Sequence, residues 1–125
     1  MTIVAARPAS TVVLLRPSTQ RFDVCLVRRH DQVAFMGGAH VFPGGRVDES
    51  DCLSVPNPIC DGLETAIHQM PMLSRAQAIG HYVAAIRELF EEAGIFLARR
   101  GSQFVSFDDP TEAARFAEYR NQLVK

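Results

Sequence analysis

The stretch Ala84–Ile95, AAIRELFEEAGI, constrains this chain more than any other. Glu88, Glu91 and Glu92 stand there at positions i, i+3 and i+4. On a helix this spacing places the three carboxylates on one face, roughly 5–6 Å apart. The stretch therefore predicts a helix with one acidic and one packed face. The expected packed stripe comprises Ile79, Tyr82, Val83, Ile86, Leu89, Phe90 and Ala93.

Three neighbouring carboxylates repel one another, so the acidic face has two interpretations. It is either a solvated surface or a set of ligands for a cation. Arg87, four residues before Glu91, can orient a carboxylate through a charge-assisted hydrogen bond. Ala84 is small enough to leave room for a ligand upstream on the same face. Carboxylate oxygens on a rigid helix suit hard cations such as Mg²⁺ or Mn²⁺.

Length and composition predict one globular domain over residues 1–125. The net charge of −1 lacks the basic excess that favours nucleic acid or an anionic membrane as a partner. The three cysteines show no CxxC spacing, which favours reduced thiols in a cytoplasmic protein. No apolar run reaches the roughly 18 residues of a membrane helix, and no secretion signal is recognisable.

The first half of the chain is expected to be mostly extended. Residues 10–15 and 22–27 predict a hairpin of two strands around a turn at 17–19. Residues 31–39 predict a loop and 40–42 a short strand, which Pro43-Gly44-Gly45 ends in a turn. Residues 47–73 contain three prolines and indicate an excursion from the core, with a short helix at 62–70.

The second half is expected to be dominated by helices. The long helix should run from an N-cap at Ser74 to Gly94. Gly80 costs about 1 kcal/mol inside it or marks its true start. Residues 95–98 and 104–107 predict two short strands. A last helix should open at Asp109-Pro110, with Glu112 completing a capping box. With few strands and an end in mid-helix, we expect a domain that is incomplete after residue 125.

The turn Phe42-Pro43-Gly44-Gly45 is a stronger candidate for a functional role when it is considered together with the acidic helix. Alone, it is an ordinary chain reversal. A glycine carbonyl can also join a metal shell, and backbone without side chains can approach phosphate oxygens. The turn and the helix are therefore candidates for two parts of one site.

These two segments resemble a known family. Arg87–Ile95 matches the REUxEExGU half of the Nudix box, in which U is a bulky aliphatic residue, and Gly44-Gly45 resembles its opening glycines. The resemblance to the Nudix hydrolase superfamily implies an α/β fold. The expected architecture is an α/β/α sandwich with a mixed sheet, and the glutamate helix packs against one face.

The box departs from the family pattern in two ways. Asp51 stands where the pattern has glutamate, although Asp48 or Glu49 could take that role. The 35 residues Cys52–Ile86 separate it from Arg87 where the family has seven, so an insertion occupies about residues 52–78. A loop absorbs such length at small entropic cost. The split box and the run 35–45 resemble a subgroup that includes coenzyme A and acyl-coenzyme A diphosphatases.

The resemblance implies a metal-dependent hydrolase of the diphosphate bond in a nucleoside-diphosphate-linked small molecule, such as coenzyme A or acyl-coenzyme A. It implies Mg²⁺ or Mn²⁺ as cofactor. The implied metal ligands are Glu88, Glu91, Glu92 and the carbonyl of Gly44, and the implied catalytic residues are Arg87, Glu88 and Glu91. Arg87 would orient Glu91 or another acid of the box.

Other residues are candidates to line the substrate site. The substrate-binding candidates are Gly45, Arg28, His40 and His81. Each histidine or arginine also has an ordinary interpretation as a solvated residue at a strand end, in a turn or on a helix. Phe35 and Met36 suit contact with an adenine or acyl group, or plain packing. Cys25 is expected in the core.

Two other functions stay open at this point. One is a nucleotide-pool, nucleotide-sugar or ADP-ribose pyrophosphatase. The other is a Nudix-like module that senses a nucleotide without cleaving it, against which the three glutamates argue. We also expect this segment to be poorly active by itself, or to form a homodimer in which the partner copy covers an open sheet edge.

Overall fold

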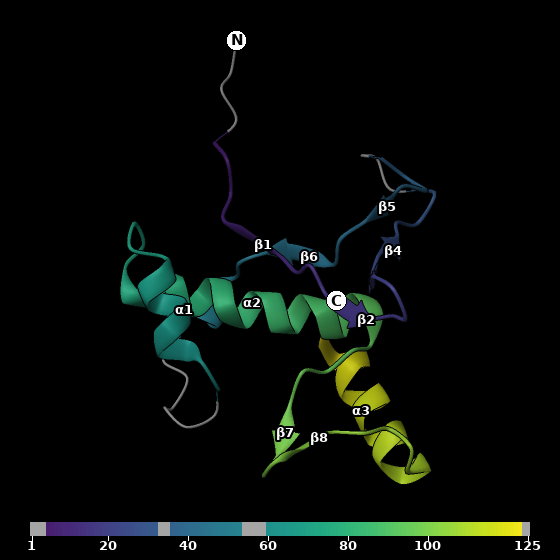
Figure 1. The fold of residues 1–125 in the computed structure, drawn as a ribbon. Helices are drawn as coiled ribbons and strands as arrows, with labels where there is room; N and C mark the ends of the chain where they lie inside the picture. Colours follow the sequence, from purple (N-terminus) through teal and green to yellow (C-terminus); the bar gives the residue numbers. More distant parts are fainter. Residues whose placement is uncertain (1–4, 33–35, 54–59, 124–125) are drawn as a thin grey trace. The chain divides into compact units, whose positions relative to one another are not determined.

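The computed structural model describes residues 5–32, 36–53 and 60–123 (Figure 1). The chain divides into two compact units. The first unit combines Met1–Thr11 with Gly44–Ala85, and the second combines Val12–Pro43 with Ile86–Lys125. One long helix, α2 (Arg75–Ala93), contributes residues to both units.

A pair of short strands opens the first unit. β1 (Ala9–Thr11) pairs antiparallel with β6 (Gly44–Arg46). The predicted turn at Pro43-Gly44-Gly45 is therefore wrong, because Gly44 begins a strand. A Cβ on Gly44 would lie only 2.3 Å from the carbonyl oxygen of Ser10. The absence of a side chain is what lets the two backbones approach.

Helical segments complete the first unit. They are the 3₁₀ turn η1 (Glu49–Cys52), α1 (Leu63–Gln69) and the first part of α2. The short helix predicted at 62–70 is confirmed by α1. The predicted start of the long helix is also confirmed: Ser74 Oγ accepts the Gln77 N–H at 3.3 Å, and Gln77 Oε1 accepts the Ser74 N–H at 2.9 Å. The buried core residues are Leu63, Ala78, Ile79 and Ala84.

Two small residues of α2 serve packing. Ala84 is fully buried, so the prediction that it leaves open space for a ligand is wrong. Gly80 lies inside the helix rather than at its start. A Cβ at Gly80 would lie 2.4 Å from Cys52 Sγ and 3.1 Å from Val47 Cγ1. Glycine therefore allows η1 to pack directly on the helix.

The second unit begins with a hairpin. β2 (Leu15–Pro17) pairs antiparallel with β3 (Phe22–Val24). This confirms the predicted hairpin, but the turn falls one residue later, where the Ser18 N–H donates to the carbonyl of Arg21 at 3.1 Å. A second pair joins β4 (Val27–Arg28) to β5 (His40–Val41).

The strands do not merge into the predicted mixed sheet. Within residues 5–32, 36–53 and 60–123 they form four separate two-stranded pairs, all antiparallel. The single strand predicted at 10–15 is divided because its two ends have different partners. Ala9–Thr11 pairs with β6, whereas Leu15–Pro17 pairs with β3. The α/β class holds, but each ladder is only two or three residues long.

The end of α2 and the last helix form the rest of the second unit. Gly94 has φ 69°, as expected for the residue that ends a helix. The strand predicted at 95–98 is wrong, because β7 (Arg99–Arg100) begins after it, and β8 (Gln103–Phe104) overlaps the strand predicted at 104–107 only at Phe104. α3 (Pro110–Leu123) is confirmed, and Asp109 Oδ1 caps it by accepting two backbone N–H bonds of 2.8 and 2.9 Å.

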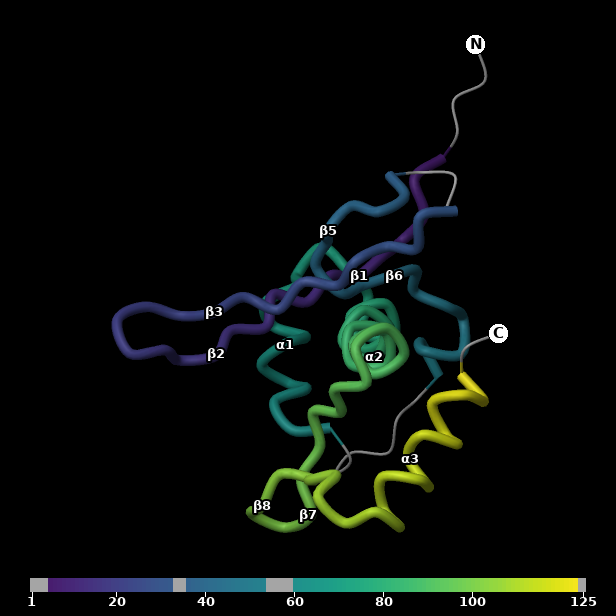
Figure 2. The backbone as a smooth tube through the Cα atoms, turned by 90° about the vertical axis from the view of Figure 1, so that its right-hand side faces the viewer, coloured from purple at the N-terminus to yellow at the C-terminus, as the bar shows by residue number. Residues whose placement is uncertain are grey.

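An aromatic cluster holds α3 against the end of α2. The ring of Phe116 lies 6.4 Å from Phe90, 5.4 Å from Phe96 and 5.2 Å from Phe107, measured between centroids. Phe90 and Phe96 are themselves 5.1 Å apart. Figure 2 looks almost along the axis of α2, and α3 follows the β7–β8 hairpin. Packing on Phe96 explains why residues 95–98 do not form a strand.

None of the helices in the described parts of the chain is long and apolar enough to span a bilayer.

Gly80→Ala should lower the free energy of unfolding by about 1–3 kcal/mol, because the new methyl group overlaps Cys52 Sγ. The same substitution in a Cys52→Ala background should cost clearly less, because the sulfur is gone and alanine favours the helix by about 1 kcal/mol. Urea denaturation of the four proteins measures this. An equal cost in both backgrounds would contradict the packing explanation.

Candidate metal and catalytic site

Arg87 links two of the three glutamates. Its Nη1 donates to Glu88 Oε1 at 2.9 Å and to Glu91 Oε1 at 3.0 Å. The three side chains are only 17%, 14% and 16% exposed, for Arg87, Glu88 and Glu91 respectively. Glu92 is exposed. Glu88 and Glu91 therefore do not form a solvated surface, because both side chains are largely buried around the Arg87 guanidinium.

The C-terminal end of α2 is held by a residue far away in sequence. Arg120 of α3 donates from Nε to the carbonyl oxygen of Glu91 at 2.9 Å and from Nη2 to that of Glu92 at 3.1 Å. These carbonyls lack partners within the helix, so the guanidinium caps them. Arg120 was not expected from the sequence, because nothing local in α3 distinguishes it from other exposed arginines.

Burial raises the pKa of Glu88 above its usual range. The hydrogen bond and charge of Arg87 oppose this effect, while the nearby charges of Glu91 and Glu92 add to it. The positive charge of Arg87 therefore does not fully offset the cost of burying the ionised Glu88 carboxylate. A site that removes water from a carboxylate without fully balancing its charge favours a bound cation.

The donor set fits Mg²⁺ or Mn²⁺ chemically, since all three side chains offer hard oxygen atoms. Among the described residues, no three histidine, cysteine or acidic side chains are grouped closely enough to hold an ion. Glu88 and Glu91 both turn an oxygen toward Arg87, which accounts for this arrangement. Side-chain rotation on a fixed helix face would be needed to bring the carboxylates together.

The other expected metal ligand lies in the first unit. Gly44 belongs to β6, and Gly45 faces Ser10 in the β1–β6 register. The roles of both glycines stay predictions. Asp51 is 3% exposed, and its Oδ2 accepts the N–H of Asp48 at 2.8 Å. Asp51 thus stabilises η1, and its assignment as the acid of the box also stays a prediction.

Arg28 and His40 are neighbours across the β4–β5 pair. Both are exposed, and Arg28 forms an ion pair with Asp31 at 2.7 Å. Their predicted contact with substrate is therefore open. His81 lies in the first unit, where its ring Nδ1 is 3.2 Å from Ser10 Oγ. Ser10 is a partner that the strand pattern around it did not reveal.

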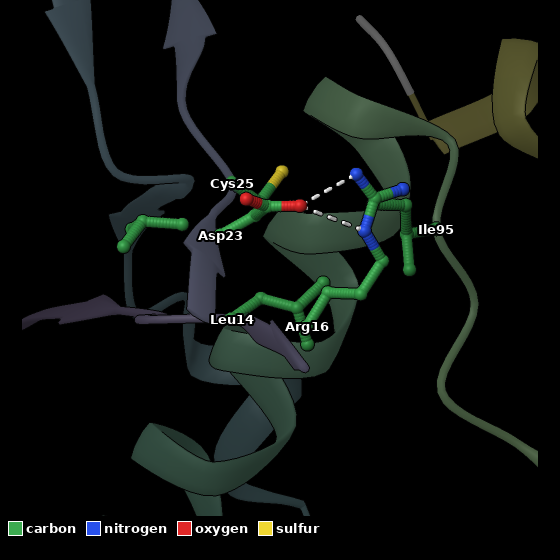
Figure 3. A pocket seen from close by; sticks show the side chains of 6 residues that line it. Leu14, Arg16, Asp23, Cys25 and Ile95 are labelled. Carbon is green, nitrogen blue, oxygen red and sulfur yellow. Dashed lines mark hydrogen bonds and ion pairs between the residues drawn. The ribbon is translucent and has the colours of Figure 1, made fainter. Parts of the chain in front are cut away.

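A cavity of about 300 Å³ lies between the β2–β3 hairpin and Ile95 (Figure 3). The ion pair between Arg16 and Asp23, 2.9 Å long, crosses it, and the Cys25 thiol lines it. Cys25 is half-buried, so its predicted place in the core is wrong. Cys25 lies between β3 and β4 rather than within a strand. Met36 is 58% exposed, and Phe35 lies outside the described residues.

Comparison with known proteins shows similarity over almost the whole chain. No family model matches the chain. A Caenorhabditis elegans protein named "Putative nudix hydrolase 7" is 29% identical over 119 residues, which are 95% of this chain and 32% of that protein. A NUDIX hydrolase crystal structure from Alicyclobacillus acidocaldarius matches with a TM-score of 0.60 and 26% identity, over 94% of this chain and 51% of the other.

The chain is similar to Nudix hydrolases in both sequence and fold. Both matches cover almost all of it, so the likeness extends well beyond the nine residues of the motif. The chain spans about a third of the length of the worm relative and about half of the bacterial chain. Neither match selects the coenzyme A subgroup.

Arg87→Gln should lower the free energy of unfolding by about 1–3 kcal/mol, because it leaves two half-buried carboxylates without their shared donor. Arg16→Gln is a matched control, since its ion pair with Asp23 is largely exposed and should be worth less than about 1 kcal/mol. Chemical denaturation at pH 7 compares the two. Equal losses would mean that the bridge adds nothing beyond a surface ion pair.

Glu88 should titrate at higher pH in the folded, metal-free protein than in the unfolded chain, as measured by carboxyl carbon NMR in EDTA with and without denaturant. A raised pKa means that the folded protein holds the proton more tightly than the unfolded chain. This contribution to the free energy of unfolding is therefore present below the unfolded pKa and is lost as pH rises through the folded one. Coincident titration of Glu88 in the folded and unfolded protein would contradict its desolvation.

Proposed function

We propose that the chain contributes the glutamate half of a divalent-metal site to a hydrolase of diphosphate bonds. The observation that supports this is the Arg87 bridge to Glu88 and Glu91, placed within a segment that matches the Nudix motif. The proposed cofactor is Mg²⁺ or Mn²⁺, held by Glu88, Glu91 and Glu92. When bound, such an ion polarises phosphoryl oxygens and lowers the pKa of a coordinated water.

The protein residues have distinct tasks in this proposal. Arg87 sets the rotamers of Glu88 and Glu91, since each gives one oxygen to the guanidinium. Arg120 and Gly94 stabilise the last turn of α2 and thereby keep the glutamate face rigid. Glu88, whose pKa is raised by burial, is the proposed carboxylate for proton exchange. Gly44 remains the proposed backbone ligand.

The proposed substrate is a nucleoside-diphosphate-linked small molecule, with coenzyme A and acyl-coenzyme A as the leading members. Support for this finer step comes from the sequence: the box is split by an insertion, and the run 35–45 resembles that subgroup. Within the described helices, the insertion supplies α1 and the start of α2. The substrate-binding candidates remain Gly45, Arg28, His40 and His81.

Glu91→Gln should reduce metal-dependent hydrolysis by about 10²–10³-fold, because an amide cannot replace a carboxylate ligand. The measurement is phosphate-ester product formation from coenzyme A, acyl-coenzyme A, ADP-ribose and NADH, with Mg²⁺ or Mn²⁺. The matched control is Glu118→Gln, the same chemical change at an exposed position of α3.

Three results would count against the proposal. The first is a rate of turnover that Glu91→Gln leaves unchanged. The second is a rate of turnover that EDTA does not reduce. The third is binding of these compounds without any cleavage by the full-length protein, which would instead support a sensing module. Cleavage of ADP-ribose but not coenzyme A would retain the hydrolase and reject its proposed substrate.

A further inference from the structure

Arg120 of α3 reaches the part of α2 that carries two of the proposed metal ligands. Its guanidinium donates to the main-chain carbonyl of Glu91 from Nε at 2.9 Å, and to that of Glu92 from Nη2 at 3.1 Å. Both glutamates lie in the last turn of α2, which ends at Ala93. The last turn of a helix frays easily when its carbonyls find no partner. One side chain of α3 therefore holds the backbone of two neighbouring ligand candidates.

The guanidinium lies close against the end of α2. A Cβ on Gly94 would be only 3.2 Å from Arg120 Nη1, which is tighter than an ordinary van der Waals contact. Nε and Nη2 point to the two carbonyls, and Nη1 lies beside Gly94. All three nitrogens of the planar guanidinium therefore meet the end of the helix, and they hold it in one orientation.

α3 is attached to the second unit by a narrow face. None of its residues is fully buried. Phe116, one turn before Arg120, provides its aromatic contacts to Phe90 and Phe96. A segment with few buried contacts opens locally at a lower free energy than the whole fold. The cap on α2 therefore exists only while α3 is docked. The half-buried positions of α3 are Glu112, Ala113, Phe116 and Arg120.

We propose that Arg120 is a positioning residue for the glutamate ligands, through which docking of α3 and binding of the metal ion favour each other. The inference rests on the proposed function, because it takes Glu91 and Glu92 as ligands. The guanidinium has two opposite effects on a cation. Its positive charge repels the ion, whereas its hydrogen bonds order the ligand backbone before the ion arrives. The second effect exceeds the first in this proposal.

Titration of the protein with Mn²⁺, followed by electron paramagnetic resonance, tests the inference without substrate or turnover. Arg120→Gln should weaken Mn²⁺ binding about fivefold or more, because loss of the cap outweighs loss of the repelling charge. Arg120→Lys keeps the charge and a donor group, so its affinity should fall between those of Arg120→Gln and the wild type. Circular dichroism shows that each variant is folded, and the lysine variant carries the test if the glutamine variant does not fold.

Arg115→Gln is the matched control for the Mn²⁺ titration. It makes the same chemical change at an exposed position of α3, where the partners of Arg115 are Glu112 and Tyr119 of the same helix. It should leave Mn²⁺ binding unchanged. A role through charge alone would instead make Arg120→Gln bind Mn²⁺ more tightly than the wild type, and a role in stability alone would leave its affinity unchanged.

The coupling should also be measurable at α3. If docking of α3 favours the ion, the ion must favour docking by the same factor. Mg²⁺ should therefore slow amide hydrogen exchange in α3 of the wild-type protein, and it should have no such effect in Arg120→Gln.

Equal or tighter Mn²⁺ binding by Arg120→Gln overturns the inference, and so does amide exchange in wild-type α3 that Mg²⁺ leaves unchanged. Mn²⁺ binding that requires Glu91 but not Arg120 overturns this inference alone and leaves the proposed function standing. A wild-type protein that binds no Mn²⁺, or Mn²⁺ binding that Glu91→Gln leaves unchanged, overturns the proposed function and this inference together.

Discussion

Desolvation of carboxylates around one guanidinium is the constraint on which the candidate site depends. Glu88 and Glu91 are largely withdrawn from water, and Arg87 supplies a donor to each. Leaving either acid unpaired would cost far more than a surface ion pair contributes. The guanidinium balances this charge only in part, as the raised pKa of Glu88 indicates. Residual negative charge on this helix is the feature that supports the proposed metal site.

That helix is rigid because both of its ends are fixed. Ser74 and Gln77 exchange hydrogen bonds at the start, and Gly94 with Arg120 ends it. The rings around Phe116 anchor α3, and through it Arg120, against the last turn. The guanidinium that caps α2 thus depends on aromatic packing more than twenty residues further along the chain.

Glycine and alanine positions show how close approach shapes the first unit. Gly44 and Gly80 each lie where a Cβ would overlap a neighbour, Ser10 in one case and Cys52 in the other. Ala84 is also fully buried. These small residues therefore serve close packing rather than leaving room for a ligand.

The sequence by itself determined the helices and the resemblance to Nudix hydrolases, because these rest on local signals. The 3.6-residue period, the Ser74 and Asp109 caps and the run Arg87–Ile95 all act within a few residues. Only the tertiary structure decided the strand partners, the burial of Glu88 and Glu91 and the cap from Arg120. Each of these depends on residues distant in the chain, such as the divided pairing of residues 9–17 with two different strands. Side-chain desolvation and strand pairing are set by which segments meet, and no local pattern records that.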